Sequence, residues 1–205
     1  MIESIYSHRK NNVPYIIEER RNPAQTIDIY SRLIEDRIIY MGEDFDNESC
    51  NRIVAQLLYL DSINHDPIRI YINSPGGSVI DGLAIIDTIN FIESPVYTIC
   101  IGLAASMGAI LLSCGEKGHR IVLPHSRVML HQVSGFTVGP LADMKIDLDQ
   151  TKKCEQDIYN ILAKNLDKSY EDIETLCDRN NWFIGQEAVD LGIADKVLTT
   201  NKLKN

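Results

Sequence analysis

The sequence predicts an α/β fold with a mainly parallel sheet, built as a single domain. Strand-like and helix-like segments alternate along the chain, which is typical of parallel strands joined by covering helices. The chain has 205 residues, 44% of them hydrophobic and 24% charged, which is the composition of one ordinary globular domain. It contains no internal repeat and no low-complexity linker, so we expect no further domain.

The first half of the chain is expected to contain two strand–helix pairs. Residues 27–42 alternate in the manner of a strand, and Asp46 or Asn47 can cap the helix that follows. Residues 68–72 (IRIYI) form a nearly continuous apolar strand, which a Gly-rich turn connects to a helix over 78–92. Because the carboxyl ends of parallel strands share one edge of a sheet, this turn is expected at the edge where loops carry chemistry.

An uncharged stretch over residues 94–115 is expected to be a buried strand, a turn and a buried helix. Its first part is β-branched and aromatic (VYTICI), whereas its second part, from about Gly102, is small and helical (AASMGAILL). The stretch is long enough for a membrane span, but Pro95 and several Gly and Ser residues make that the weaker interpretation. Two further strands are expected at RIVLP (120–124) and RVMLH (127–131).

The last third of the chain is expected to begin with a long helix. Pro140 is suitable as a first helical residue, and apolar residues recur at helical spacing to about Leu166. Residues 132–166 are therefore expected to project from the domain and to mediate assembly. A second helix over 170–177, a short strand and the segment EAVDLGIADKVL complete the chain.

The charge balance and the cysteines restrict the partners and the compartment. Asp and Glu number 29 against 20 Lys and Arg, a net charge of −9, so no cationic field attracts nucleic-acid phosphates or anionic lipids. We therefore expect no nucleic-acid partner and no membrane partner. The five cysteines are widely spaced without a CxxC pair, and the charged opening does not read as a signal peptide. These features predict reduced thiols and a cytoplasmic protein.

A serine and a histidine near predicted strand ends are candidates for nucleophilic catalysis. Ser106 lies in the segment ASMG at an expected helix start, where small neighbours permit a tight turn and leave the hydroxyl exposed. Taken alone, such a serine is more often a helix cap. A serine nucleophile needs a base, and His131, at the end of an apolar strand, is the best placed of the five histidines.

The Gly-rich turn NSPGGS at 73–78 is a candidate oxyanion hole. Its adjacent glycines let backbone N–H groups approach a substrate oxygen. A phosphate cradle is the competing interpretation, but the turn has no Lys and the chain has neither GxxxxGK[ST] nor GxGxxG. The chain also has no HxH, HExxH or Cys/His cluster, so we expect no metal and no cofactor.

Four ordered motifs, IYINSPGGSV, TICIGLAASMGA, SRVMLHQ and EAVDLGIADKVL, resemble those of the ClpP peptidases along nearly the whole chain from about Val13 onward. The resemblance implies a crotonase-like fold with a projecting handle strand and helix. It implies a serine endopeptidase in which Ser106 is the nucleophile and His131 is the base. It further implies that the backbone amides of Gly77 and Met107 form the oxyanion hole.

The resemblance also implies a division of the chain and a set of partners. Residues 1–12 correspond to an N-terminal extension or propeptide, 13–26 to an axial segment, 27–199 to the peptidase domain and 200–205 to a C-terminal tail. The implied assembly is a tetradecamer of two stacked sevenfold rings. An AAA+ unfoldase such as ClpX or ClpC would feed unfolded polypeptide into it.

The chain departs from the family at the third position of the triad. The family has an Asp there, whereas alignment through EAVDLG places Asn180 at this position. Asp178 and Arg179 correspond instead to the ring-to-ring contact, although Asp178 swinging toward His131 is an alternative. An Asn oxygen can accept the imidazole N–H but adds no charge, and an Asp-to-Asn change in another serine triad lowers kcat by roughly 10⁴. The departure predicts a slow peptidase that a partner activates.

Two smaller departures concern docking and substrate. Tyr71 and Phe91 match aromatic residues of the family's unfoldase docking site, whereas Arg69 stands where another Tyr is common. The family commonly has Pro two residues after the catalytic His, where this chain has a Val whose N–H can bond to substrate. The residues expected to pair with substrate as strands are Ser78, Val79, Val133 and Ser134.

These observations leave more than one function open. The first is a serine endopeptidase, the proteolytic subunit of an ATP-dependent Clp protease, which works best in a mixed assembly with a second, more typical ClpP. The second is a nearly silent structural or regulatory ring subunit that modulates such a paralogue. An acyl-CoA enzyme of crotonase architecture is a weaker third interpretation, because it needs the two amides but neither Ser106 nor His131.

Overall fold

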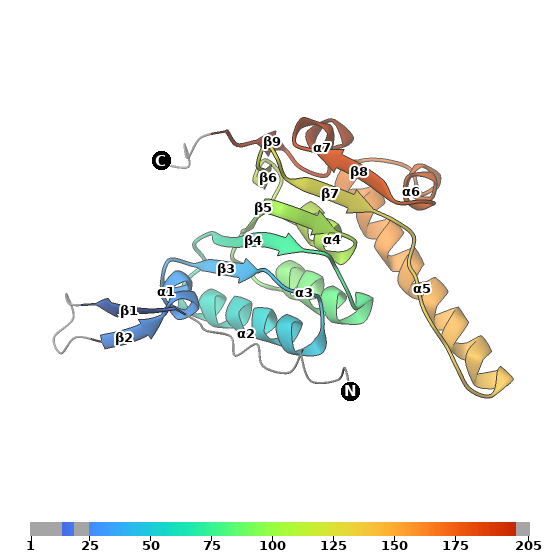
Figure 1. Ribbon diagram of the computed structural model, residues 1–205, viewed down its shortest axis with the longest axis horizontal. Coiled ribbons are helices and arrows are strands. Elements are labelled where there is room, and N and C mark those ends of the chain that lie inside the picture. Colours follow the sequence, from blue (N-terminus) through green and yellow to red (C-terminus); the bar gives the residue numbers. More distant parts are fainter. Residues whose placement is uncertain (1–13, 19–24, 200–205) are drawn as a thin grey trace, which may run out of the picture.

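A mainly parallel sheet is the frame of the computed structural model, which describes residues 14–18 and 25–199 (Figure 1). The strands are β1 (Tyr15–Glu18), β2 (Gln25–Asp28), β3 (Ile38–Met41), β4 (Ile68–Ser74), β5 (Val96–Ala105), β6 (Arg120–Val122), β7 (Arg127–Leu130), β8 (Asn181–Ile184) and β9 (Lys196–Val197). The helices are α1 (Ile29–Glu35), α2 (Asn47–Ile63), α3 (Val79–Phe91), α4 (Met107–Ser113), α5 (Leu141–Leu166), α6 (Tyr170–Cys177) and α7 (Gln186–Leu191).

The order of the strands in the sheet brings chemistry-bearing loops together. The main path is β3-β4-β5-β6-β9, with parallel pairing throughout. Beyond the β5–β6 pairing, β7 pairs in parallel with the last residues of β5, and β8 pairs antiparallel with β7. The carboxyl ends of β4, β5 and β7 therefore lie at one edge of the sheet, which confirms the expected α/β fold.

Helices bury one face of the sheet. In β4 the buried residues Ile68, Ile70, Ile72 and Ser74 alternate with more exposed ones. Figure 1 shows α2 and α3 below the sheet, and every residue of α4 is buried. The uncharged stretch over 94–115 is thus a buried strand and helix, as expected. Within the described residues, no helix has the length and apolarity needed to cross a bilayer.

The start of α2 confirms the predicted cap. The Asp46 carboxylate accepts the backbone N–H of Ser49 at 2.8 Å, and the Ser49 hydroxyl accepts the Asp46 N–H at 3.1 Å. This reciprocal pair satisfies two N–H groups at the helix end. The apolar face of the helix then enters the core through Ile53, Leu57 and Leu60, which are at most 3% exposed.

Two of the expected boundaries are wrong. The strand expected over 27–42 is interrupted by α1, because the Asp28 carboxylate accepts the N–H groups of Tyr30 and Ser31, both at 3.0 Å, and caps a helical turn. The helix expected from about Gly102 begins only at Met107. The residues before it continue β5, because Ala105 pairs with the neighbouring strand β7.

A projecting handle, residues 132–166, leaves the body of the domain after β7 (Figure 1). Its helix α5 begins after Pro140 and ends at Leu166, as predicted. The end of α5 near the body buries Ile158 and Leu162, whereas Leu141 at the far end is 69% exposed. The chain that leads into α5 pairs with no strand within the described structure, so the expected handle strand stays a prediction.

The structure describes only some of the expected divisions of the chain. Residues 1–12 and 200–205, predicted as an extension and a tail, lie outside the described residues. Of the predicted axial segment 13–26, the described part contributes β1 and the start of β2, which form an antiparallel hairpin.

Candidate active site

Ser106 occupies a strained turn between β5 and α4. Its backbone has φ 53° and ψ −123°, and it is one of three non-glycine residues with positive φ in the described chain. Such a conformation costs of the order of 1–3 kcal/mol and is typical of nucleophiles displayed on a strand-to-helix turn. Its N–H donates to the carbonyl oxygen of Met129 at 2.9 Å, which fixes the turn against β7. Its hydroxyl makes no hydrogen bond with any described residue and does not cap α4.

The Gly-rich turn after β4 packs directly against this serine. A Cβ added at Gly76 (φ 96°) would lie 2.6 Å from the Ser106 Cβ and 3.0 Å from the Met107 nitrogen. A Cβ at Gly77 (φ 150°) would lie 2.3 Å from the carbonyl oxygen of Phe45. Both positions therefore require glycine, and the lack of side chains is what brings the turn so close.

The two amides predicted for the oxyanion hole lie beside the serine. Gly77 adjoins the residue that touches Ser106, and Met107 follows the serine directly. Neither N–H donates to an acceptor in the described chain. Unbonded N–H groups at such a position can bind the oxygen of a tetrahedral intermediate.

Strand pairing places His131 and Asn180 at the same edge. Ala105 of β5 pairs with Met129 of β7, so the residues that follow these strands, Ser106 and His131, emerge at one end of the sheet. In the antiparallel pair β7–β8, Leu130 is opposite Asn181, so the same register continued by one residue places His131 opposite Asn180.

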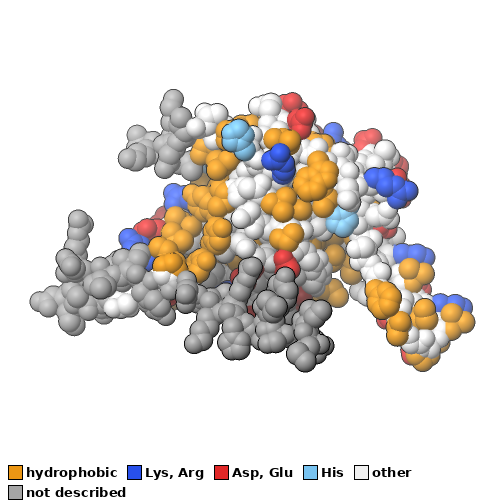
Figure 2. Space-filling view, in the orientation of Figure 1, with side chains coloured by type: hydrophobic (Ala, Val, Ile, Leu, Met, Phe, Trp, Pro, Cys, Tyr) orange, Lys and Arg blue, Asp and Glu red, His pale blue; other side chains and the backbone are white. Residues whose placement is uncertain are grey.

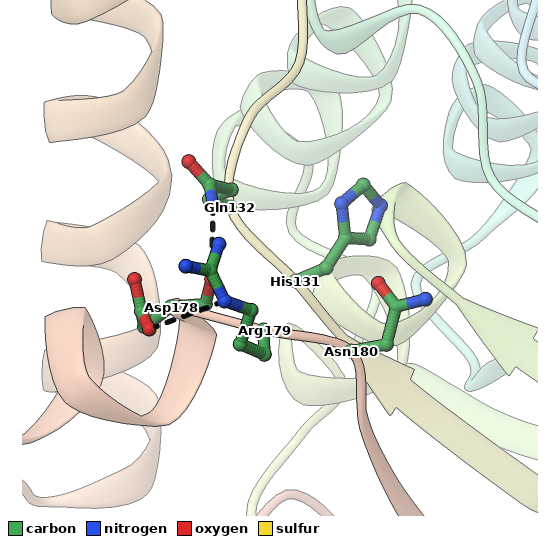
Figure 3. A pocket seen from close by; sticks show the side chains of 5 residues that line it. All are labelled: His131, Gln132, Asp178, Arg179 and Asn180. Atoms are coloured by element: carbon green, nitrogen blue, oxygen red, sulfur yellow. Dashed lines mark hydrogen bonds and ion pairs between the residues drawn. The ribbon is translucent and has the colours of Figure 1, made fainter.

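One cavity contains both side chains. It is lined by His131, Gln132, Asp178, Arg179 and Asn180. Figure 3 shows the His131 ring and the Asn180 carboxamide on one side of this cavity, and Gln132, Asp178 and Arg179 on the other. Within the described residues no hydrogen bond joins Ser106, His131 and Asn180. In this chain the groups share one edge, but the proton path from serine to imidazole is not formed.

Asp178 and Arg179 engage each other. The Arg179 Nε lies 3.7 Å from the Asp178 Oδ2, and the two side chains are 83% and 67% exposed. Figure 3 shows the Asp178 carboxylate directed toward Arg179. The ring-to-ring contact of this pair and the alternative approach of Asp178 to His131 stay predictions.

Gln132 lies at this site, although no sequence motif indicates a role for it. Its Nε2 donates to the backbone carbonyl oxygen of Asp178 at 2.8 Å (Figure 3). The bond links the end of β7 to the segment that leads into β8. No local signal points to it, because the partner is 46 residues away in the chain.

The residues expected to pair with substrate divide into two kinds. Ser78 and Val79 form no strand: Ser78 is the N-cap of α3, its own N–H donates to Phe45 at 2.7 Å, and Val79 is the first helical residue. Val133 and Ser134 follow β7 in the chain leading to α5, and their backbone groups make no hydrogen bond with described residues. Only this second pair presents free backbone at the edge of the site.

The expected docking residues lie away from the nucleophile. Arg69 and Tyr71 are half-buried on one side of β4, where Arg69 is opposite Tyr97 of β5. Phe91, the last residue of α3, is 80% exposed. Their role in docking stays a prediction.

Burial makes at least two of the thiols poor nucleophiles. All five cysteines are free. Burial raises the pKa of Cys100 and of Cys177 to about 11, so both are protonated at neutral pH and lack the thiolate that reacts. Among the described residues no three His, Cys, Asp or Glu side chains gather as a metal site.

Comparisons with known proteins show the family. The family model described as Clp protease matches residues 20–201. The ATP-dependent Clp protease proteolytic subunit of Bacteroides fragilis is 47% identical over 188 residues, which cover 90% of this chain and 90% of that protein. The ATP-dependent Clp protease proteolytic subunit 1 of Prochlorococcus marinus is 44% identical over 193 residues, covering 94% and 99%, and that of Salinibacter ruber is 42% identical over 192 residues, covering 93% and 82%. Since four sequence motifs and these comparisons agree over nearly the full length, the chain belongs to the Clp protease family, a family of serine-type peptidases.

Proposed function

We propose that the chain is a proteolytic subunit that cleaves unfolded polypeptide through an acyl-enzyme on Ser106. The observation that carries this proposal is the strained Ser106 turn, with the Gly76–Gly77 turn packed against it. A hydroxyl left unbonded beside two unbonded N–H groups serves acyl transfer, because it supplies both the nucleophile and the charge stabilisation.

Each residue then has a defined chemical role. His131 accepts the Ser106 proton as the hydroxyl oxygen attacks the substrate carbonyl carbon. The N–H groups of Gly77 and Met107 bind the resulting oxyanion. His131 next donates the proton to the departing amine. In the second half of the reaction His131 accepts a proton from a water molecule, whose oxygen attacks the acyl carbon, and then returns the proton to the Ser106 oxygen as the acyl bond breaks. The free backbone of Val133 and Ser134 would hold the substrate extended beside the serine.

Asn180 makes this chemistry slow in the isolated chain. As the third member of the triad it can accept the N–H of His131, but its carboxamide is neutral and does not stabilise the imidazolium. In the chain described here Asn180 makes no hydrogen bond with His131. A partner that fixes the positions of both residues would therefore raise the rate.

Assembly is the source of such a partner. Apolar side chains gather on the projecting part of the handle (Figure 2) and include Phe136, Val138, Leu141, Ile146 and Leu148, which are 51–94% exposed. Exposed apolar groups in this number favour burial against another subunit. We propose stacked heptameric rings, with Asp178 and Arg179 at the contact between rings, and a mixed assembly with a more typical ClpP. An AAA+ unfoldase would dock over Arg69, Tyr71 and Phe91, in the cytoplasm.

A second candidate function is a nearly silent ring subunit that regulates a catalytically active paralogue. The observation that favours it is the same neutral Asn180 beside an unbonded His131. The two candidates differ in whether Ser106 itself reacts.

A fluorophosphonate probe followed by mass spectrometry distinguishes the two. Labelling of Ser106 in the purified homomer supports the peptidase, and labelling that begins only after a second ClpP is added supports activation in a mixed particle. Ser106→Ala is the control for the labelled site. An unlabelled Ser106 under both conditions would eliminate the peptidase proposal, and summed activities with separate particles in native mass spectrometry would eliminate the mixed assembly.

A further inference from the structure

Gln132 ties together the two segments that carry the histidine and the asparagine of the triad. It follows His131 directly in the chain. Its Nε2 donates to the backbone carbonyl oxygen of Asp178 at 2.8 Å, and Asp178 precedes Asn180 by two residues. All four residues line the same cavity (Figure 3).

The position of this bond matters because of where the strand pairing ends. The antiparallel register of β7 and β8 ends at Leu130 opposite Asn181. His131 and Asn180 are the next opposed residues, and no further ladder pair lies beyond them. The Gln132 bond supplies a connection on that open side. His131 and Asn180 therefore lie between the last strand pair, Leu130 and Asn181, on one side and the Gln132 hydrogen bond on the other.

No other side chain in this cavity makes an equivalent connection. Asp178 has its carboxylate engaged with Arg179, and Arg179 is 83% exposed. The Asn181 amide donates within its own segment, to the carbonyl oxygen of Leu176 at 3.4 Å. Without Gln132, the segment 178–180 would be attached to β7 only through the ladder.

We infer that Gln132 is a positioning residue that holds Asn180 opposite His131; this inference rests on the proposed peptidase function. A charged third residue would be drawn toward the histidine by electrostatic attraction, whereas a neutral carboxamide depends on geometry alone. Errors of about 1 Å in the placement of catalytic groups can cost up to about 10²-fold in rate. A hydrogen bond that fixes the position of the third residue is therefore more important in a triad that contains Asn than in one that contains Asp.

A purely structural role for Gln132 makes a different prediction from a positioning role. If the bond only anchors α6 to the sheet, its loss lowers activity whatever residue stands at position 180. If it acts through Asn180, its loss has no effect once Asn180 is gone. The coupling between the two substitutions therefore separates the two roles.

The test compares Gln132→Leu in the wild-type chain and in Asn180→Ala. The rate of fluorophosphonate labelling of Ser106, together with kcat and KM for a small fluorogenic peptide, is measured on the assembled protein. We expect Gln132→Leu to lower kcat and the labelling rate about tenfold in the wild-type background, with KM changed less than about twofold. In Asn180→Ala we expect no further decrease.

The controls keep the outcomes distinct. Gln186→Leu, which removes an exposed hydrogen bond to Asp190 on α7 outside the handle, should leave the rates unchanged. Gln132→Glu, which keeps the length but replaces the N–H donor, should behave like Gln132→Leu. Native mass spectrometry checks the assembly of each variant. Equal losses in both backgrounds, or no loss in the wild-type chain, overturn the positioning role while labelling of Ser106 still supports the peptidase. Failure to label Ser106 in every variant overturns both.

Discussion

Arg37 and Ser106 both adopt a positive φ, at 58° and 53°, but they differ in what their side chains do there. The Arg37 guanidinium donates to the carbonyl oxygens of Leu60 and Asp66 at 2.9 and 2.7 Å, and to the Ser94 hydroxyl at 3.1 Å. The Ser106 hydroxyl bonds to nothing in the described chain. The Arg37 side chain offsets strain with hydrogen bonds, whereas the Ser106 side chain makes none in the described chain.

The two residues also lie at opposite ends of the sheet. Arg37 precedes β3, and with Asp61 and Ser94 it connects the end of α2 to the amino ends of the strands. Ser106 follows β5 at the other edge, where the side chains of His131 and Asn180 also make no hydrogen bond with described residues. Proteins keep unsatisfied and strained groups where function needs them, which supports the proposed catalytic role of the Ser106 end and a structural role of the Arg37 end.

Removing the Ser106 hydroxyl should have the largest effect of the predicted substitutions, a loss of peptide hydrolysis. Ser106→Ala is expected to lower peptide hydrolysis at least about 10³-fold, because no other group can form the acyl-enzyme. Ser106→Gly should be equally inactive and should raise the free energy of unfolding by about 1 kcal/mol, because glycine tolerates φ 53°. Hydrolysis rates and thermal melting measure the two effects, and a glycine variant less stable than wild type would contradict the assignment of strain.

Restoring a charge at position 180 should have the next largest effect. Asn180→Asp is expected to raise kcat for small peptides by about 10²-fold, because a carboxylate stabilises the imidazolium that forms on His131. Native mass spectrometry verifies that the particle is unchanged, and Asn160→Asp on the exposed face of α5 is a matched control. No gain in an intact particle would show that Asn180 does not limit the rate.

At the structural end, the same kind of truncation should reduce stability without reducing the rate per active particle. Arg37→Leu is expected to lower the free energy of unfolding by about 2–3 kcal/mol, because it leaves several carbonyl groups at the end of α2 without a donor. For a chain of this size the melting temperature should fall by about 5–10 °C. Arg52→Leu, which removes exposed ion pairs with Glu43 and Glu48, should shift melting very little. Similar shifts in melting temperature for Arg37→Leu and Arg52→Leu would contradict a special structural role of Arg37.

Low pH should reduce the stability of the fold at the Arg37 end of the sheet, because Asp61 becomes protonated there. Hydrogen bonds from the Ser94 hydroxyl and backbone, with a contribution from His65, lower the pKa of Asp61 to about 2 from its ordinary value of 3.8. A carboxyl group whose pKa falls on folding adds stability above its unfolded pKa, and this stability is lost as the pH falls from about 4 toward 2. Urea midpoints measured across this range should fall less steeply in Asp61→Asn than in wild type. The exposed Asp157→Asn variant should follow wild type, and parallel curves for all three would refute the contribution of Asp61.

The sequence predicted those parts of the fold that depend on local pattern. The cap at Asp46, the helix after Pro140 and the strand β4 are confirmed because each depends on neighbouring residues. The motifs predicted the family, which the comparisons confirm. The helix α1 was missed because seven residues with a mixed apolar pattern do not separate the helical period from the strand period, and only Asp28 as a cap distinguishes them.

Long-range contacts could not be predicted. The extension of β5 through Ala105 depends on pairing with β7, and small residues alone do not indicate it. The bond from Gln132 to Asp178 likewise depends on how β7 and β8 align. The opposition of His131 and Asn180 follows from that same register, so the residue types at the site could be predicted but not their separation in this chain.

The exposure of Asn180 affects how readily this position can change during evolution. Since its side chain is exposed and contributes no hydrogen bond to the folded chain, an exchange at this position carries little penalty in folding or assembly. Gly76 and Gly77, by contrast, admit no larger residue without steric collision. Under the proposed function, a one-residue exchange at this position would therefore change the rate of turnover without preventing assembly. A duplicated gene could diverge by this route into a subunit that depends on its parent.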